Sequence, residues 1–292
     1  QANRSITKWI LGLMALGFGL AFHKIQDSNE HSRITWTSAV FEIDLDSESI
    51  TVQVKEDIVA EVRDTVENMM KQGTIDISAL QTLAGQSNCI AGLLYTWRPF
   101  VSMLYGPIYD TRSRTPFNGQ KVWRCALDVP LTWMSAFLKG LRGTLSRTYF
   151  LSDFLGEGDQ VSITIDASPL RLGGWLMING IIKEVFSDPI SKLDQKILGC
   201  RTGGSEGQQL WESLTVLVAL RLWASYWNGR RVQLRVRGDN VSALIMLVKM
   251  KSTGDGMNLI ARELALDIAE SVYEPSVAEH LPGVTNDMAD WL

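Results

Sequence analysis

Strict alternation of apolar and polar residues marks the most regular part of the chain, the segment VSITIDA at positions 161–167. In a β-strand such alternation directs the apolar residues to one face and Asp166 to the other. Two further apolar runs, GGWLMI and IIKEVF, flank the pair Asn179-Gly180, which is a strong signal for a β-hairpin. The segment VQLRVRGDN alternates again and carries Asp239 on the parity opposite to the core residues. Two of these predicted strands therefore end on an aspartate.

Helical periodicity is interleaved with these strands. The segment SEGQQLWESLTVLVALRLWASYW predicts a long helix, with Ser205 and Gln208 at capping-box spacing at its start. Glu212 is expected near the border of its buried stripe, which consists of Leu210, Leu214, Leu217 and Val218. A helix from about Val241, another over 257–272, a short strand near Val277 and a last helix follow. We therefore expect an α/β fold, a mixed sheet with flanking helices.

The first half of the chain predicts a small sheet followed by helices. The sequence predicts short strands at RITW, VFEIDL and ITVQV. It predicts helices over residues 55–71, over ISALQTLAGQSNCIAGLLYTW and over a short stretch before Pro107. Residues 111–128 look irregular, and Pro130 opens another helix. The segment LGEGDQ at 155–160 is the best candidate domain boundary. The apolar segment 9–22 is shorter than the about 20 residues that cross a bilayer, so we expect a buried helix and no membrane partner.

Charge changes this picture in one region. The chain of 292 residues has a net charge of −4, which argues against strong non-specific binding of a polyanion. Between Thr96 and Arg147, however, eight Lys and Arg stand against two acidic residues and are interleaved with aromatic side chains. Such a segment suits a nucleic-acid backbone, although a solvated face with buried aromatic residues gives the same pattern. The candidate contacts are Arg112, Arg114, Lys121 and Arg124.

The cysteines indicate a cellular compartment, and the first residues indicate how the chain arises. Three scattered cysteines and three histidines form no zinc or disulfide pattern, and favour a reducing, intracellular compartment, cytoplasmic or nuclear. The sequence begins with Gln inside an apolar helical pattern, so we expect an excised fragment or a processed product.

Four carboxylates carry the candidate chemistry. Asp166 and Asp239 should project at the carboxyl edge of the sheet, Glu212 lies in the first turns of the long helix, and Asp290 belongs to the last helix. Clustered carboxylates demand protonation or a cation, and hard oxygen ligands select Mg²⁺ or Mn²⁺. Two such ions can drive an in-line phosphoryl displacement. Taken singly, each carboxylate is better explained as a solvated residue at a strand end or a helix start.

The segments ITIDASPLRLGGW, QQLWESLTVLVAL, VRGDN and EHLPGVTNDMADWL together resemble the ribonuclease H domain of retroelement reverse transcriptases. The resemblance implies that Asp166, Glu212, Asp239 and Asp290 form the metal-binding D-E-D-D site. His280 falls on the family's loop histidine, which serves proton transfer or product release. Asn240 and Asn286 lie in the motifs around the last two aspartates and are implied to contact nucleic acid. The implied partner is an RNA/DNA hybrid, and the implied cofactor is two Mg²⁺ or Mn²⁺ ions.

The resemblance extends upstream, to the end of a reverse transcriptase palm and its passage into the thumb. It implies a palm remnant at 1–54, a thumb-like helical module at 55–110, a connection at 111–155 and a ribonuclease H-like domain at 156–292. Residues 36–41 lack the glycine of the family's palm hairpin, and the chain has no Asp-Asp pair. We therefore expect no polymerase activity from this chain alone, and a partner that supplies the fingers and the rest of the palm.

Three hypotheses about the function remain open. The first is metal-dependent hydrolysis of the RNA strand of a hybrid, the second a non-catalytic nucleic-acid-gripping fragment of a decayed element. The third is another nuclease of the same fold, such as an integrase or resolvase. Those enzymes use a different order of acidic residues and lack the motif that this chain has from His280 to Asp290, so this hypothesis ranks last. The sequence ends two residues after Asp290, so we expect this aspartate in a fraying helical turn. A chain longer by two helical turns should then bind its second metal more tightly and cleave faster.

Overall fold

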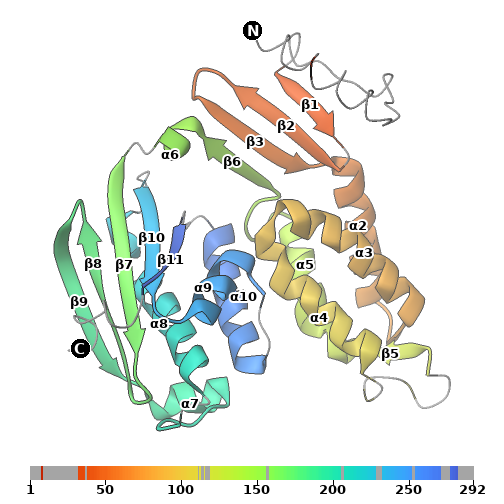
Figure 1. Cartoon of the computed structure of the whole chain (residues 1–292). Coiled ribbons are helices and arrows are strands. Elements are labelled where there is room, and N and C mark those ends of the chain that lie inside the picture. The colour runs from red at the N-terminus through yellow and green to blue at the C-terminus, as the bar shows by residue number, and fades with distance from the viewer. Residues whose placement is uncertain are drawn as a thin grey trace.

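In a computed structural model, the second half of the chain is built around a five-stranded mixed sheet (Figure 1). The structure describes residues 8, 32–36, 38–110, 112, 115, 119–155, 158–204, 207–227, 232–251, 254–270 and 277–281. The sheet has the order β11-β10-β7-β8-β9. Its strands are β7 (Asp159–Ala167), β8 (Arg171–Ile178), β9 (Ile181–Pro189), β10 (Val232–Gly238) and β11 (Val277–His280).

The strand pairing agrees with the sequence patterns. β7, β8 and β9 pair antiparallel, whereas β10 runs parallel to β7 and β11 runs parallel to β10. The expected hairpin turn between β8 and β9 is confirmed: Asn179 has φ 51° and Gly180 φ 81°, the left-handed values of the turn that Asn-Gly favours. Because β7 and β10 are parallel neighbours, the residues at their carboxyl ends lie side by side.

Helices pack on this sheet as expected. They are α7 (Lys192–Leu198), α8 (Gln208–Leu222), α9 (Val241–Lys249) and α10 (Asp255–Ala269). Ser205, the expected cap of the long helix, lies outside the described residues, and α8 starts at Gln208 after Gly207, later than the capping-box spacing predicted. The observed capping box opens α7, where Ser191 and Asp194 each accept the other's main-chain N–H, and the sequence reading missed this short helix.

The first half contains the expected small sheet and helices. Helices α2, α3, α4 and α5 form a module beside the sheet β1-β2-β3-β6. The strands are β1 (Arg33–Trp36), β2 (Ala39–Asp44), β3 (Ser49–Val54) and β6 (Ser146–Phe150), and the helices are α2 (Glu56–Met70), α3 (Ile77–Leu93), α4 (Arg98–Tyr109) and α5 (Asp128–Leu138). The pairing of β6 with β3 was not predicted. A short helix α6 (Leu151–Leu155) follows β6.

Some expectations are corrected in detail. Residues 111–128 are not uniformly irregular, because β5 (Lys121–Trp123) pairs with β4 (Thr74–Asp76) and a 3-10 helix follows over Arg124–Leu127. Pro107 lies inside α4 rather than after it, and α5 begins two residues before Pro130. A proline in the first helical turn is tolerated, since its missing N–H would have no intrahelical partner.

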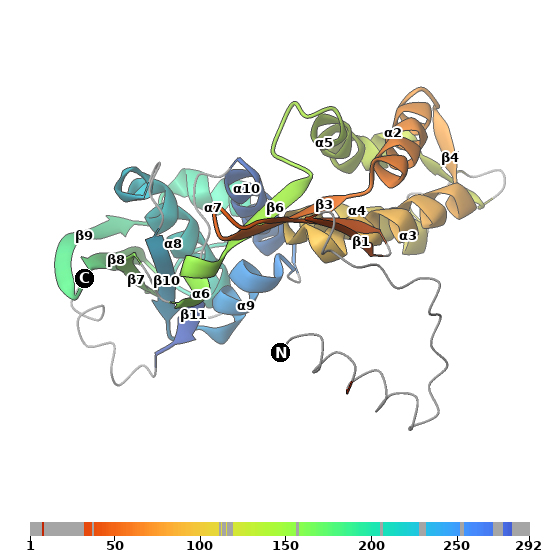
Figure 2. The ribbon, with the colours of Figure 1, turned by 90° about the horizontal axis from the view of Figure 1, so that it is seen from above.

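The two halves are in contact. Helix α10 packs against α4 and against the 3-10 helix Tyr95–Trp97, and the buried apolar residues of both halves belong to one continuous cluster. Seen from above, helices α2–α5 lie on one side and the five-stranded sheet on the other (Figure 2). Among the described residues, no helix is long and apolar enough to cross a membrane. The predicted helix at 9–22 and the predicted last helix lie outside the described residues. The fold class expected from the sequence is confirmed.

Candidate active site

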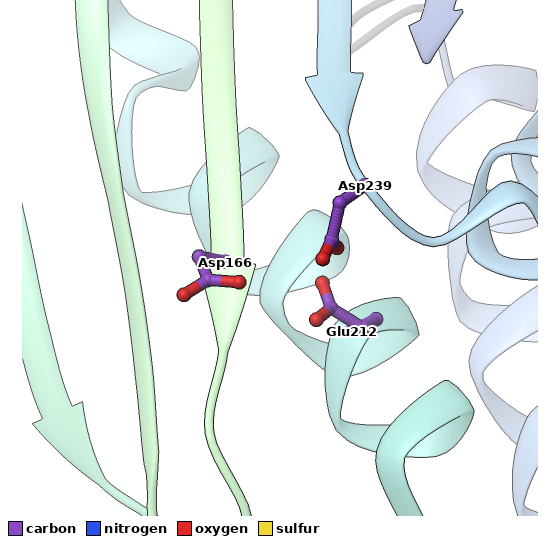
Figure 3. Close-up of side chains that lie close together, drawn as sticks. All are labelled: Asp166, Glu212 and Asp239. Atoms are coloured by element: carbon purple, nitrogen blue, oxygen red, sulfur yellow. The ribbon is translucent and has the colours of Figure 1, made fainter. Parts of the chain in front are cut away.

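Three carboxylates converge at the carboxyl edge of the five-stranded sheet. Asp166 is the second-last residue of β7, Asp239 directly follows β10, and Glu212 lies on α8. One oxygen from each carboxylate lies within 4.8 Å of the other two. Figure 3 shows the carboxylates of Glu212 and Asp239 pointing toward each other, with Asp166 beside them. The parallel pairing of β7 with β10 produces this proximity, and it places both aspartates at the carboxyl edge of the sheet, where the sequence analysis expected them.

Glu212 is the buried member of the cluster. Its exposed fraction is 1%, whereas Asp166 and Asp239 are half-buried. Burial, the largest cause, together with the charges of Asp166 and Asp239, raises the pKa of Glu212 to about 8. A carboxyl group that is costly to ionise beside two other carboxylates is a site that a cation would stabilise.

The two oxygens of Glu212 differ in their surroundings. Oε1 accepts the main-chain N–H of Ala167 at 3.1 Å and the side-chain amide of Gln208 at 3.1 Å. The same amide of Gln208 also donates to the Ala167 carbonyl. Oε2 is buried and has no hydrogen-bond partner among the described residues. Because buried polar oxygens are nearly always satisfied, Oε2 is an oxygen that a cation bound among the three carboxylates would satisfy.

The burial of Glu212 corrects the sequence expectation. Leu214 and Val218 are only partly buried, whereas Trp211, Thr215, Val216, Ala219 and Leu220 are fully enclosed. Helix α8 is covered on most of its surface, so Glu212 lies inside the buried part and not at its border. A helix packed between a sheet and other helices has no narrow apolar stripe, and its periodicity then misplaces the buried face.

His280 lies at the same edge of the sheet. It is the last residue of β11, it aligns with Gly238 in the parallel pairing, and its side chain is exposed. The N–H of Leu281 donates to the Gly238 carbonyl at 2.9 Å, which fixes the end of β11 beside the residue that precedes Asp239. Asp290 and Asn286 lie outside the described residues.

Asn240 has a structural contact of its own. Its Oδ1 accepts the main-chain N–H groups of Ser242 at 2.9 Å and Ala243 at 3.3 Å, so it caps the N-terminus of α9. This cap fixes the main chain directly after Asp239. Contact of Asn240 with nucleic acid stays a prediction.

Three of the four basic residues selected from the sequence pair with an aspartate. Arg112 pairs with Asp110, Lys121 with Asp76, and Arg124 with Asp128. Arg114 lies outside the described residues. These pairs are at least partly solvent-exposed, and exposed pairs are weak, so their role in nucleic-acid binding stays a prediction.

Gln208 is a site residue that the sequence reading gave another role. It was interpreted as part of a helix cap, but its amide holds Glu212 and the end of β7 together. The signal was present in the spacing, because residues four apart lie on the same side of a helix.

The three carboxylates fit a hard divalent cation. They offer only oxygen donors, which is the ligand type that Mg²⁺ and Mn²⁺ prefer. The unpartnered Oε2 of Glu212 would gain the partner that the described residues do not provide.

Comparison with known proteins finds only distant structural likenesses. No protein-family model matches the chain, and no curated protein sequence is significantly similar to it. Among solved structures, RNase H1 from the halophilic archaeon Halobacterium salinarum NRC-1 is 21% identical over 46% of this chain and 93% of its own, with a TM-score of 0.34.

Foamy viral protease-reverse transcriptase structures overlap more of the chain. One, in complex with dsDNA, is 13% identical over 87% of this chain and 45% of its own, with a TM-score of 0.29. Another, in complex with an RNA/DNA hybrid, is 12% identical over 87% of this chain and 30% of its own, also with a TM-score of 0.29. The chain thus spans less than half the length of these viral proteins.

Proposed function

We propose that this chain is a metal-dependent nuclease that hydrolyses the RNA strand of RNA/DNA hybrids. The observation that carries the proposal is the convergence of Asp166, Glu212 and Asp239, in which the buried Oε2 of Glu212 has no hydrogen-bond partner among the described residues. This arrangement supports a site for hard cations, and the motifs around the three residues resemble those of a ribonuclease H. Asp290 is proposed as a fourth ligand.

The chain's own residues would perform distinct tasks. Asp166, Asp239 and Oε2 of Glu212 would hold two Mg²⁺ or Mn²⁺ ions. When bound, such ions activate a water and stabilise charge on the departing oxygen of a phosphodiester. Gln208 and the Ala167 N–H hold Oε1 of Glu212, which leaves the buried Oε2 as the oxygen of this carboxylate that is available to a cation. His280, exposed beside the same edge, is proposed to transfer a proton or assist product release.

We further propose that the chain belongs to a retroelement reverse transcriptase, with fingers and most of the palm supplied by sequence outside this chain. This extends the resemblance of the upstream segments. Polymerase activity is not expected of the present residues, because they contain no Asp-Asp pair.

The decisive test is cleavage of an RNA/DNA hybrid labelled on the RNA strand, in Mg²⁺ or Mn²⁺. Asp166→Asn and Asp239→Asn should abolish cleavage, because each removes a charged ligand without changing side-chain size. Asp188→Asn, which changes an exposed aspartate on β9, is the matched control and should cleave like the unaltered chain. Equal cleavage by all variants would contradict the proposal.

Substrate choice separates the remaining readings. Cleavage of the hybrid but not of a DNA duplex of the same sequence supports the ribonuclease H reading over an integrase-like or resolvase-like nuclease. Tight binding of the hybrid with no cleavage in either metal would support a non-catalytic gripping fragment.

A further inference from the structure

A groove of about 580 Å³ lies where α3 and α4 meet the chain that follows α9. It is therefore built by both halves of the molecule. Its lining contains cations and no acidic side chain. The residues that matter here are Asn88, Gly92, Arg98, Tyr105, Lys249 and Lys251.

Among the described residues, no carboxylate forms an ion pair with the cations of this groove. Arg98 donates to main-chain carbonyls, through Nε to Ala91 at 3.2 Å and through Nη1 to Lys249 at 3.2 Å. In the part of the chain that the structure describes, none of Arg98, Lys249 and Lys251 forms an ion pair. Arg112, Lys121 and Arg124, which the sequence singled out, are all paired with aspartates. Uncompensated positive charge in a concave surface attracts an extended anion.

The rest of the lining suits a sugar–phosphate backbone. The Asn88 amide donates to the Tyr105 hydroxyl, so two neutral hydrogen-bonding groups lie beside the cations. The Tyr105 ring stacks on the ring of Tyr109, four residues further along α4, at a centroid distance of 6.4 Å. A Cβ atom added at Gly92 would meet no atom within 4 Å, so the groove is open at this position.

Helix α9 links this groove to the acidic cluster. It begins two residues after Asp239 and ends at Lys249, so its nine residues separate the two sites by about 14 Å along its axis. That length corresponds to roughly four base pairs of a duplex with a rise of about 3.4 Å per pair.

We infer that this groove binds the sugar–phosphate backbone of the nucleic acid whose RNA strand is cut at the acidic cluster. The identity of the duplex rests on the proposed function, whereas the binding itself does not. The groove makes the helical module part of the substrate-binding surface, through residues contributed by both halves of the chain.

The test is a binding titration of a labelled RNA/DNA hybrid in EDTA, repeated at several salt concentrations. Each phosphate contact contributes about 0.9 to the slope of log affinity against log salt. Lys249→Ala/Lys251→Ala should weaken binding severalfold and reduce the magnitude of this slope by roughly two. Gly92→Leu, which fills the groove without changing charge, should weaken binding too. Lys55→Ala/Lys71→Ala, at the two ends of α2, is the charge-matched control and should retain the original slope.

Two results would overturn the inference: an unchanged slope for the Lys249/Lys251 variant, or equal losses in that variant and in the Lys55/Lys71 control. Competition distinguishes the source of the phosphate. A mononucleotide or inorganic phosphate that displaces the hybrid as effectively as unlabelled duplex, at equal phosphate concentration, would mark a small-anion site and also overturn it.

The outcome is separable from that of the proposed function, because binding in EDTA requires no catalysis. If the unaltered chain binds the hybrid but does not cut it, the proposed function fails and the groove is still tested by the slope. If the Lys249/Lys251 variant binds and cuts like the unaltered chain, only the groove inference fails. With both correct, this variant should raise KM and leave kcat at saturating hybrid nearly unchanged.

Discussion

Oε1 of Glu212 lies 3.1 Å from the main-chain nitrogen of Ala167, the residue that directly follows Asp166. This hydrogen bond ties α8 to the end of β7 and fixes the glutamate beside the first aspartate. It also lowers the pKa of Glu212, against the larger effects of burial and of the charges of Asp166 and Asp239, which raise it to about 8. Ionisation of Glu212 is therefore unfavourable in the folded chain, and a cation bound beside it would stabilise the ionised form.

Stability in the absence of divalent ions should fall as the pH rises. The pKa of Glu212 is about 8 in the folded chain against an ordinary value of 4.5, so the folded state holds the additional proton between these values. This stabilisation is complete below pH 4.5 and is lost as the pH approaches 8, by up to about 1.4 kcal/mol per pH unit. Urea unfolding in EDTA across this range should show the slope. Glu212→Gln should remove most of it, and an identical slope in both proteins would contradict the assignment.

Metal binding should release a proton from Glu212. Below pH 8 this carboxyl is mostly protonated, and it must ionise to serve as a ligand. Calorimetric titration with Mn²⁺ in two buffers of different ionisation enthalpy should give a release approaching one proton per chain near neutral pH. Glu212→Gln serves as the control, since it has no proton to lose at this position. Equal proton release from both proteins would show that another group is responsible.

Gln208→Ala should impair catalysis by loosening Glu212. Oε1 would lose the Gln208 amide, and the pKa of Glu212 would rise further because that hydrogen bond lowers it. We expect activity to fall about tenfold or more, as for other residues that orient metal ligands, and the pH–rate profile to move to higher pH. Gln209→Ala changes an exposed neighbour on the same helix and should do neither. A lower rate with an unmoved profile would argue for a purely structural role.

Gly174→Ala should destabilise the sheet beside the site. A Cβ at this position would lie 2.7 Å from the Thr164 carbonyl oxygen and 3.1 Å from the Phe186 ring. The oxygen belongs to the paired backbone of β7 and cannot move freely, so we expect a loss of about 1–3 kcal/mol in urea unfolding. Gly85→Ala, in an exposed and open position on α3, should instead stabilise by up to about 1 kcal/mol. Similar effects at the two glycines would contradict this account.

Local patterns in the sequence determined much of the candidate site. The alternation around Asp166 and before Asp239 gave the strands and their polar face, and Asn179-Gly180 gave the hairpin. Residues that repeat every two or every 3.6 positions show their periodicity without knowledge of the fold. The proximity of Asp166 and Asp239 followed from parallel strands ending at one edge.

Tertiary structure alone decided the features that join distant segments. The sequence did not indicate that β6 would complete the sheet of β1–β3, that Gln208 would hold Glu212, or that Lys249 would meet Arg98 across a groove. Nor did it reveal that Glu212 is enclosed, because α8 packs on several sides at once. Periodicity reports which face of one element is apolar. Which elements then cover that face, and which charges remain without a partner, depends on contacts between residues far apart in the chain.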